Sequence, residues 1–275
     1  MENQKNKNAQ AIAIGFALIF LVGAFTYLRN FSFSKENSTD KQSASNPAKN
    51  VTELGTQIVS IQDLNKWINQ KAKLEIIDVR STDEFAAEHI IGSTNIPFDS
   101  LQNNLNGLDK NTKTVFLDSD GNPDDQQFFS NFFKTNQLSN FYFLDGGFAN
   151  WKSQIYPTIS AGDFNSFTDR AKVTFIESDK LKELMGQNKN LLLIDVRKSD
   201  EFAGGHLKGA INIFMDDLEN KRNQIPVGKQ IVVYDNDGQW AYKAAVRLFD
   251  LGFFNALSLS DGLDTWKKKN YEVVK

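Results

Sequence analysis

Two acidic loops with the same pattern, Asp-x-Asp-Gly, carry the residues of this chain that are best suited to chemistry. The first loop begins at Asp118 and the second at Asp235, and each directly follows a run of apolar residues. Paired carboxylates can bind a divalent cation, act as nucleophiles, or accept hydrogen bonds from the N–H groups of a following helix. The chain contains no cysteine, which excludes disulfides, thiolate metal sites and a cysteine nucleophile.

Length and composition favour a folded protein of two domains. The chain has 275 residues, of which 40% are apolar and 23 are Phe. At about 150 residues per domain, this length fits two domains better than one. The net charge of −3 is weak and mixed in sign, so we expect no binding to nucleic acid or to an acidic lipid surface.

The N-terminal part predicts attachment to a membrane. A basic segment, residues 1–10, precedes the uncharged apolar run 11–28, which as a helix would span about 27 Å. We interpret this run as a single-pass anchor with the domains on the outer, periplasmic or extracytoplasmic side. A cleaved export signal ending at Ala24, which would release a secreted protein, stays open. Residues 29–54 are rich in Ser, Asn and Lys and predict a disordered tether.

The remainder of the chain is an internal repeat with an offset of 117 residues, which drops to 115 near the end of each copy. Residues 77–80 (IDVR) align with 194–197, and 83–86 (DEFA) align with 200–203. We therefore predict one domain at 55–157, a linker at 158–171 and a second domain at 172–275.

Each copy alternates short apolar runs with helical patterns, which predicts an α/β fold with a small parallel sheet and helices on both faces. In the first copy the predicted strands are 74–79, 94–96, 113–117 and 141–144, and the predicted helices are 82–88, 99–105, 124–134 and 148–152.

The repeated motifs closely resemble those of the rhodanese family. They are Asp-Val-Arg-x-x-x-Glu-Phe, His-x-x-Gly-(Ala/Ser)-x-Asn-Ile and a late Gly residue followed by Trp four residues on, and they cover about 220 residues. The resemblance implies tandem rhodanese-like domains. In active members a cysteine after the fourth strand accepts a sulfane sulfur and transfers it.

Asp118 and Asp235 stand where the resemblance places that cysteine. The remaining residues of the two loops that correspond to the active site are Ser119, Asp120, Gly121, Asn122 and Pro123 in one copy and Asn236, Asp237, Gly238, Gln239 and Trp240 in the other. A carboxylate oxygen is neither a soft nucleophile nor a carrier of transferable sulfur. The basic residue expected near the end of each loop is also missing, so both loops should repel anionic sulfur donors. The related cell-cycle phosphatases share the fold and use a cysteine and an arginine on this loop. Both residues are absent from both loops of this chain, so the same argument excludes that activity.

Other repeated residues have structural interpretations. These motif residues are Asp78, Arg80 and His89 in the first copy and Asp195, Arg197 and His206 in the second. We predict ion pairs of Arg80 with Glu84 and of Arg197 with Glu201, with substrate clamping as the alternative role. We interpret both histidines as turn residues, with catalytic bases or metal ligands as the alternative. Trp151 and Trp266 should pack the last helix of each domain onto its sheet.

The sequence therefore predicts a membrane-tethered, catalytically inactive binding or scaffolding module with an unknown protein partner, no cofactor and no metal. The alternative is an enzyme, either a rhodanese-related sulfurtransferase that uses the cysteine of another protein or a metal-assisted enzyme that uses the acidic loops. Those loops locally resemble the nucleophile motif of haloacid-dehalogenase-type phosphatases. As non-catalytic elements, the first Asp of each loop would cap a helix, with a cation site or a partner contact as the other roles.

Overall fold

The protein is described by a computed structural model, which places residues 57–104, 108–187 and 190–275. The predicted N-terminal segments 1–10, 11–28 and 29–54 lie outside these residues. Within the described ranges, no helix is long and apolar enough to cross a membrane, and the anchor stays a prediction.

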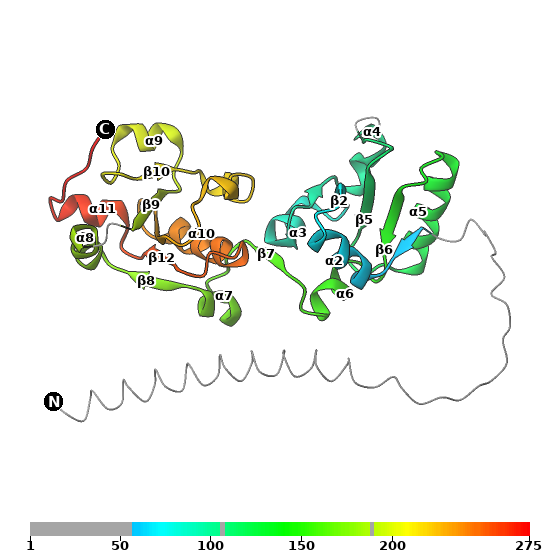
Figure 1. Ribbon diagram of the computed structural model, residues 1–275, viewed down its shortest axis with the longest axis horizontal. Coiled ribbons are helices and arrows are strands. Elements are labelled where there is room, and N and C mark those ends of the chain that lie inside the picture. The colour runs from blue at the N-terminus through cyan, green and yellow to red at the C-terminus, as the bar shows by residue number, and fades with distance from the viewer. Residues whose placement is uncertain (1–56, 105–107, 188–189) are drawn as a thin grey trace, which may run out of the picture. The chain divides into compact units, whose positions relative to one another are not determined.

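The first domain is built on a five-stranded parallel sheet with the order β1-β6-β5-β2-β4. Figure 1 labels its central strands β6, β5 and β2. Its strands are β1 (Ile58–Val59), β2 (Leu74–Asp78), β4 (Thr94–Asn95), β5 (Lys113–Leu117) and β6 (Phe141–Leu144). Its helices are α2 (Ile61–Asn69), α3 (Thr82–Ala87), the 3₁₀ turn η1 (Phe98–Ser100), α4 (Leu101–Asn104), α5 (Pro123–Thr135) and α6 (Gly147–Ser153).

The second domain repeats this order as β8-β12-β11-β9-β10. Its strands are β8 (Thr174–Ile176), β9 (Leu191–Asp195), β10 (Ile211–Asn212), β11 (Gln230–Tyr234) and β12 (Ala256–Leu259). Its helices are α8 (Ser178–Gln187), α9 (Ser199–Gly204), the 3₁₀ turns η3 (Met215–Asp217) and η4 (Arg222–Gln224), α10 (Gln239–Asp250) and α11 (Gly262–Lys268). The predicted tandem of parallel α/β domains is confirmed.

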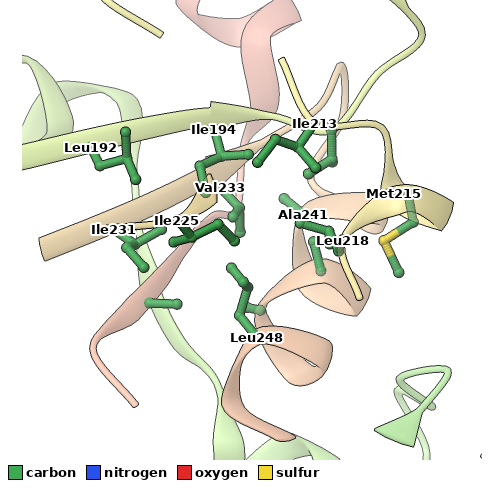
Figure 2. Packing of buried hydrophobic residues seen from close by; sticks show 14 residues of the cluster. Leu192, Ile194, Ile213, Met215, Leu218, Ile225, Ile231, Val233, Ala241 and Leu248 are labelled. Atoms are coloured by element: carbon green, nitrogen blue, oxygen red, sulfur yellow. The ribbon is translucent and has the colours of Figure 1, made fainter. Parts of the chain in front are cut away.

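Alternating strand residues bury opposite faces of each sheet, and helices cover both faces. In the second domain, Ile194 and Val233 pack with Leu248 of α10 (Figure 2), whereas Val232 packs with Trp266 of α11 on the other side. The first domain is divided in the same way between α5 on one side and α2 with α6 on the other. Burial on both faces explains why the strand sequences are continuous apolar runs rather than alternating ones.

The predicted linker 158–171 contains regular structure. Strand β7 (Thr158–Ser160) pairs antiparallel with β3 (Glu88–Ile90) of the first domain, and helix α7 (Phe167–Lys172) follows it. In the second domain, a single antiparallel bridge joins His206 to Val274 at the corresponding place. In each domain, a later segment of the chain therefore pairs antiparallel with the backbone of the histidine.

Candidate functional site

The two acidic loops lie at the carboxyl ends of the central strands β5 and β11. The residues before them, Leu117 and Tyr234, are fully buried and hold the strands in the cores. Helices α5 and α10 begin where the loops end. In open parallel sheets this edge, with helix N-termini beside it, is where ligands bind.

In each loop the first aspartate folds back onto the loop's own N–H groups. Asp118 accepts a hydrogen bond through Oδ1 from the N–H of Gly121 at 2.7 Å, and Asp235 accepts one from Gly238 at the same distance. Asp235 accepts a second bond through Oδ2 from the N–H of Trp240 at 3.0 Å. A carboxylate of the protein therefore occupies the position in which an anion would contact these donors.

The two loops differ at one backbone donor. Residue 123, which matches Trp240 in the repeat, is a proline and has no N–H to offer. Oδ2 of Asp118 is buried, and no donor among the described residues reaches it. The carboxyl of Asp125 lies within hydrogen-bond reach of Asp118, and it is an acceptor when ionised.

This difference appears in the acidity of the two aspartates. Burial, followed by the facing carboxyl of Asp125, raises the pKa of Asp118 to about 7, and the Gly121 N–H offsets only part of that effect. Burial also raises the pKa of Asp235, where the N–H groups of Trp240 and Gly238 counteract it and Asp237 adds to it. The first loop therefore holds a carboxyl that is poorly stabilised as an anion.

Three carboxylates converge at the first loop, two from the loop itself and one, Asp125, from the first turn of α5. Oxygen atoms of Asp118, Asp120 and Asp125 all lie within 4.8 Å of one another. They line a cavity of about 350 Å³ together with Arg80 and Phe98. The corresponding cavity of the second domain, about 230 Å³, is lined by two carboxylates of its loop and by Arg197, Glu201 and Trp240.

The N-terminus of the last helix of each domain donates hydrogen bonds to the backbone carbonyls of the acidic loop. The N–H groups of Phe148 and Ala149 donate to the carbonyls of Asp118 and Ser119, at 2.9 and 2.8 Å. Gly147 has a φ of +55°, and a Cβ there would lie 2.5 Å from Asp118 Oδ1. The late glycine of the motif is thus required by close contact with the loop, beyond its predicted role as a turn.

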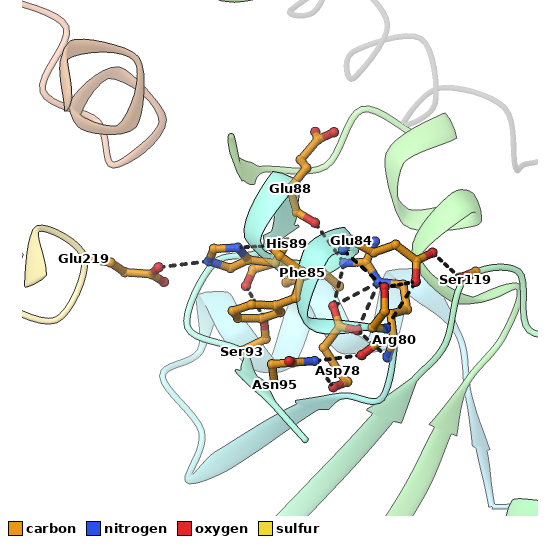
Figure 3. Close-up of polar contacts among 12 residues, drawn as sticks. Asp78, Arg80, Glu84, Phe85, Glu88, His89, Ser93, Asn95, Ser119 and Glu219 are labelled. Carbon is orange, nitrogen blue, oxygen red and sulfur yellow. Dashed lines mark hydrogen bonds and ion pairs between the residues drawn. The ribbon is translucent and has the colours of Figure 1, made fainter. Parts of the chain in front are cut away.

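The predicted ion pairs of the arginines with Glu84 and Glu201 are wrong. Arg80 instead pairs with the fully buried Asp78, with Nη2 2.6 Å from Oδ2, and also donates to the carbonyl of Glu88 (Figure 3). Arg197 and Asp195 repeat this pair at 2.6 Å. A buried carboxylate at the end of each strand requires a countercharge, which the more exposed glutamates do not.

The glutamates serve the loops and the helix ends instead. Glu84 forms a capping box with Ser81 and accepts a bond from Ser119 at 3.1 Å. Glu201 accepts a bond from Asn236 at 2.8 Å, and Arg197 donates to the same Asn236 at 3.1 Å. Each arginine is therefore paired with a buried aspartate rather than with the predicted glutamate.

The two histidines occupy equivalent structural positions. His89 stacks on Phe85 with ring centroids 4.1 Å apart, and His206 stacks on Phe202 at 3.8 Å. Nδ1 of each lies 2.9–3.0 Å from the carbonyl of that Phe. His89 has an additional contact that the sequence did not reveal, because its Nε2 lies 3.0 Å from Oε2 of Glu219 (Figure 3).

The structure brings the predicted loop residues together, and most of them have local roles. Asn122 caps α5, Asp237 accepts a bond from Gln239 at 3.0 Å, and Asp120 accepts one from Asn122. Trp151 and Trp266 are buried in the cores, as expected from their motif. Asp125 was not predicted as a site residue, although an acidic residue in the first turn of the helix that follows the loop was a usable signal.

Comparison with known protein families agrees with this architecture. The sequence profile of the rhodanese-like domain matches residues 60–154 and 177–269. A sulfurtransferase of Allochromatium vinosum is 26% identical over 102 residues, which are 37% of this chain and 95% of that protein. The thiosulfate sulfurtransferase GlpE of Shewanella oneidensis is 29% identical over 31% of this chain and 85% of its own. A crystal structure of a thiosulfate sulfurtransferase from Pseudomonas aeruginosa aligns with 79% of this chain and 43% of its own, at 16% identity and a TM-score of 0.39.

Proposed function

The chain belongs to the family of rhodanese-like domains, and from that premise we propose that both of its domains are non-catalytic modules that bind another protein. The observation that carries this proposal is the position of Asp235, both of whose carboxylate oxygens accept N–H groups of the loop. A persulfide or an anionic donor would need those same groups. In the second domain, the carboxylate of Asp235 already occupies these N–H groups.

The chemistry of the residues points the same way. Sulfur transfer needs a thiolate that can form and break a sulfur–sulfur bond, and the chain has no cysteine. The arginine nearest to each loop is held by a buried aspartate. The second acidic side chain of each loop, Asp120 or Asp237, adds repulsion toward an incoming anion.

The rims of the two cavities favour a protein partner. Phe98 and Phe128 are 42% and 41% exposed, and their ring centroids lie 5.0 Å apart beside the first loop. Trp240 is 41% exposed and lies 5.7 Å from Phe214 beside the second. An acidic centre with an aromatic rim suits basic and aromatic side chains of another protein. We expect the partner to present Lys or Arg to the second loop.

We further propose that the apolar run 11–28 anchors the two domains to a membrane and that the tether 29–54 holds them on its outer side. Full-length protein should remain in the membrane fraction through alkaline carbonate, and a chain that starts near Val51 should be soluble. External protease should remove both domains from cells with a permeabilised outer layer. Protection until the inner membrane is broken would reverse the orientation.

Inactivity is tested with the purified full-length chain. We expect thiosulfate:cyanide sulfurtransferase activity no higher than that of a boiled control and no mass increase corresponding to a bound sulfur atom. Detection of a covalently sulfurated form of the protein would refute the proposal.

Partner binding is tested by photo-crosslinking in intact membranes. A photoreactive residue replaces Phe98 or Trp240 on the rims, and the same residue at Val227, which is 92% exposed, is the matched control. We expect a discrete crosslinked protein from the rim positions that is absent from the control position. Equal crosslinking from all three positions would show that the loops are not the binding face.

A further inference from the structure

We propose that the loop after β5 binds a divalent cation, with Ca²⁺ the best fit, through Asp118, Asp120 and Asp125, and that the loop after β11 does not. The inference goes beyond the proposed binding function, because occupancy by a cation and binding of a partner are measured separately.

The geometry of the three carboxylates suits such an ion. Their ligand oxygens lie within 4.8 Å of one another. Oxygens bound to one Ca²⁺ at about 2.4 Å are at most about 4.8 Å apart. The cavity that these side chains line, about 350 Å³, leaves room for the water molecules that would complete a shell of six or more oxygens.

The orphaned oxygen of Asp118 is a second observation that points to a ligand site. Asp118 is only 9% exposed, and its Oδ2 has no donor among the described residues. A buried carboxylate oxygen without a partner is costly, and such atoms call for a specific explanation. Because the neighbouring carboxyl of Asp125 is an acceptor when ionised, a cation between the two carboxylates would satisfy this oxygen of Asp118.

The second domain serves as an internal control within the same chain. There the corresponding oxygen of Asp235 is satisfied by the N–H of Trp240 at 3.0 Å. The third carboxylate is absent as well, because the residue that matches Asp125 at the offset of 117 is the buried Tyr242. Only the first loop therefore combines a free buried oxygen with three acidic ligands.

Two positive charges near the first loop oppose the binding of a cation, and the negative charge of the third carboxylate, Asp125, offsets them. The N-terminus of α5 carries a partial positive charge, and Arg80 lines the same cavity. The charge of Arg80 is largely balanced by its pair with Asp78. Asn122 also holds Asp120 and Asp125 in place, since its Nδ2 lies 3.2 Å from one and 2.6 Å from the other. The ligands are thus preorganised without using Asn122 Oδ1, which caps α5.

The test uses full-length, chelator-treated protein in detergent and Ca²⁺ as the probe, with binding followed by titration calorimetry. We expect one Ca²⁺ per chain and, at saturating millimolar Ca²⁺, a rise of about 5 °C in the melting temperature of the first domain. Asp125→Asn should weaken Ca²⁺ binding by about tenfold or more. The matched variant Asp237→Asn, in the second loop, should bind Ca²⁺ like the parent.

Three results would overturn the proposal: no Ca²⁺ binding by the parent at millimolar concentration, undiminished binding by Asp125→Asn, or an equal loss in Asp237→Asn. Circular dichroism in chelator shows whether Asp125→Asn is folded. If it is not, the more exposed Asp120→Asn replaces it in the same comparison.

Discussion

Removing the charge of Asp118 should change how the stability of the first domain depends on pH. The pKa of this carboxyl rises from 3.8 to about 7 on folding, chiefly through burial and then through Asp125. A raised pKa means that the folded state binds the proton more tightly than the unfolded state. The stabilisation is therefore complete below about pH 4 and is lost as the pH rises toward about 7.

The magnitude follows from the size of the shift. Three pKa units at about 1.4 kcal/mol each give at most about 4 kcal/mol, and relaxation of the site reduces this to about 2 kcal/mol. Asp118→Asn keeps an oxygen acceptor for the Gly121 N–H and offers an amide donor beside the carboxyl of Asp125. In chelator at pH 8 we expect this variant to be more stable than the parent by about 2 kcal/mol. At pH 4 the two should be nearly equal.

Hydrogen exchange in denaturant, resolved by peptide, measures this effect locally. Peptides from β5 report on the first domain and peptides from β11 report on the second, so the two unfolding reactions are separated. The control is Asp124→Asn, which makes the same charge change at an exposed neighbouring position of α5. Parallel pH profiles of Asp118→Asn and the parent between pH 4 and 8 would refute the reasoning, and so would a variant that is less stable at pH 8.

Three further predictions test other parts of the site. Asp235→Cys alone should not restore thiosulfate:cyanide transfer above the parent's background, because the loop keeps Asp237 and still lacks an unpaired Arg or Lys that could bind the anionic donor. Robust turnover by this variant would show that the effect of the loop charges on donor binding is misjudged. Gly262→Ala should destabilise the second domain by about 2–4 kcal/mol in chemical unfolding, since a Cβ there meets the Asn236 carbonyl at 2.2 Å, whereas Gly209→Ala, with an open site at φ +81°, should cost only about 1 kcal/mol. Asp195→Ala should cost about 3–5 kcal/mol by leaving Arg197 buried without its partner, and a loss below about 1 kcal/mol would contradict the structural role of that pair.

Much of the fold could be predicted from sequence because the strands are buried on both faces. The runs at 74–79, 113–117 and 141–144 give β2, β5 and β6 within one residue, and the helix predicted at 124–134 matches α5. Strand β1 was missed because two residues, Ile58–Val59, show no period. Helix α2 was missed although Ser60 is an evident N-cap for it.

The site was only partly predictable. The repeat offset located both loops, but the sequence could not show which N–H groups each aspartate accepts. The donors depend on where the following helix begins. Helix α5 begins five residues after Asp118, whereas α10 begins four residues after Asp235. The partners of Arg80 and Arg197 were mistaken because helical spacing was applied where a buried strand-end carboxylate lies closer.

The inward-folded aspartates also determine how freely this position can vary. A side chain without an acceptor at 235 would leave the N–H groups of Gly238 and Trp240 unsatisfied, at a cost of about 1–3 kcal/mol each if water does not replace it. A saturation library selected only for folding should therefore retain mainly Asp and Asn there. Such a pattern of intolerance would look like that of a reacting group, although its origin is the backbone that surrounds it. Position 118, with one donor fewer, should accept a wider range of residues in the same library.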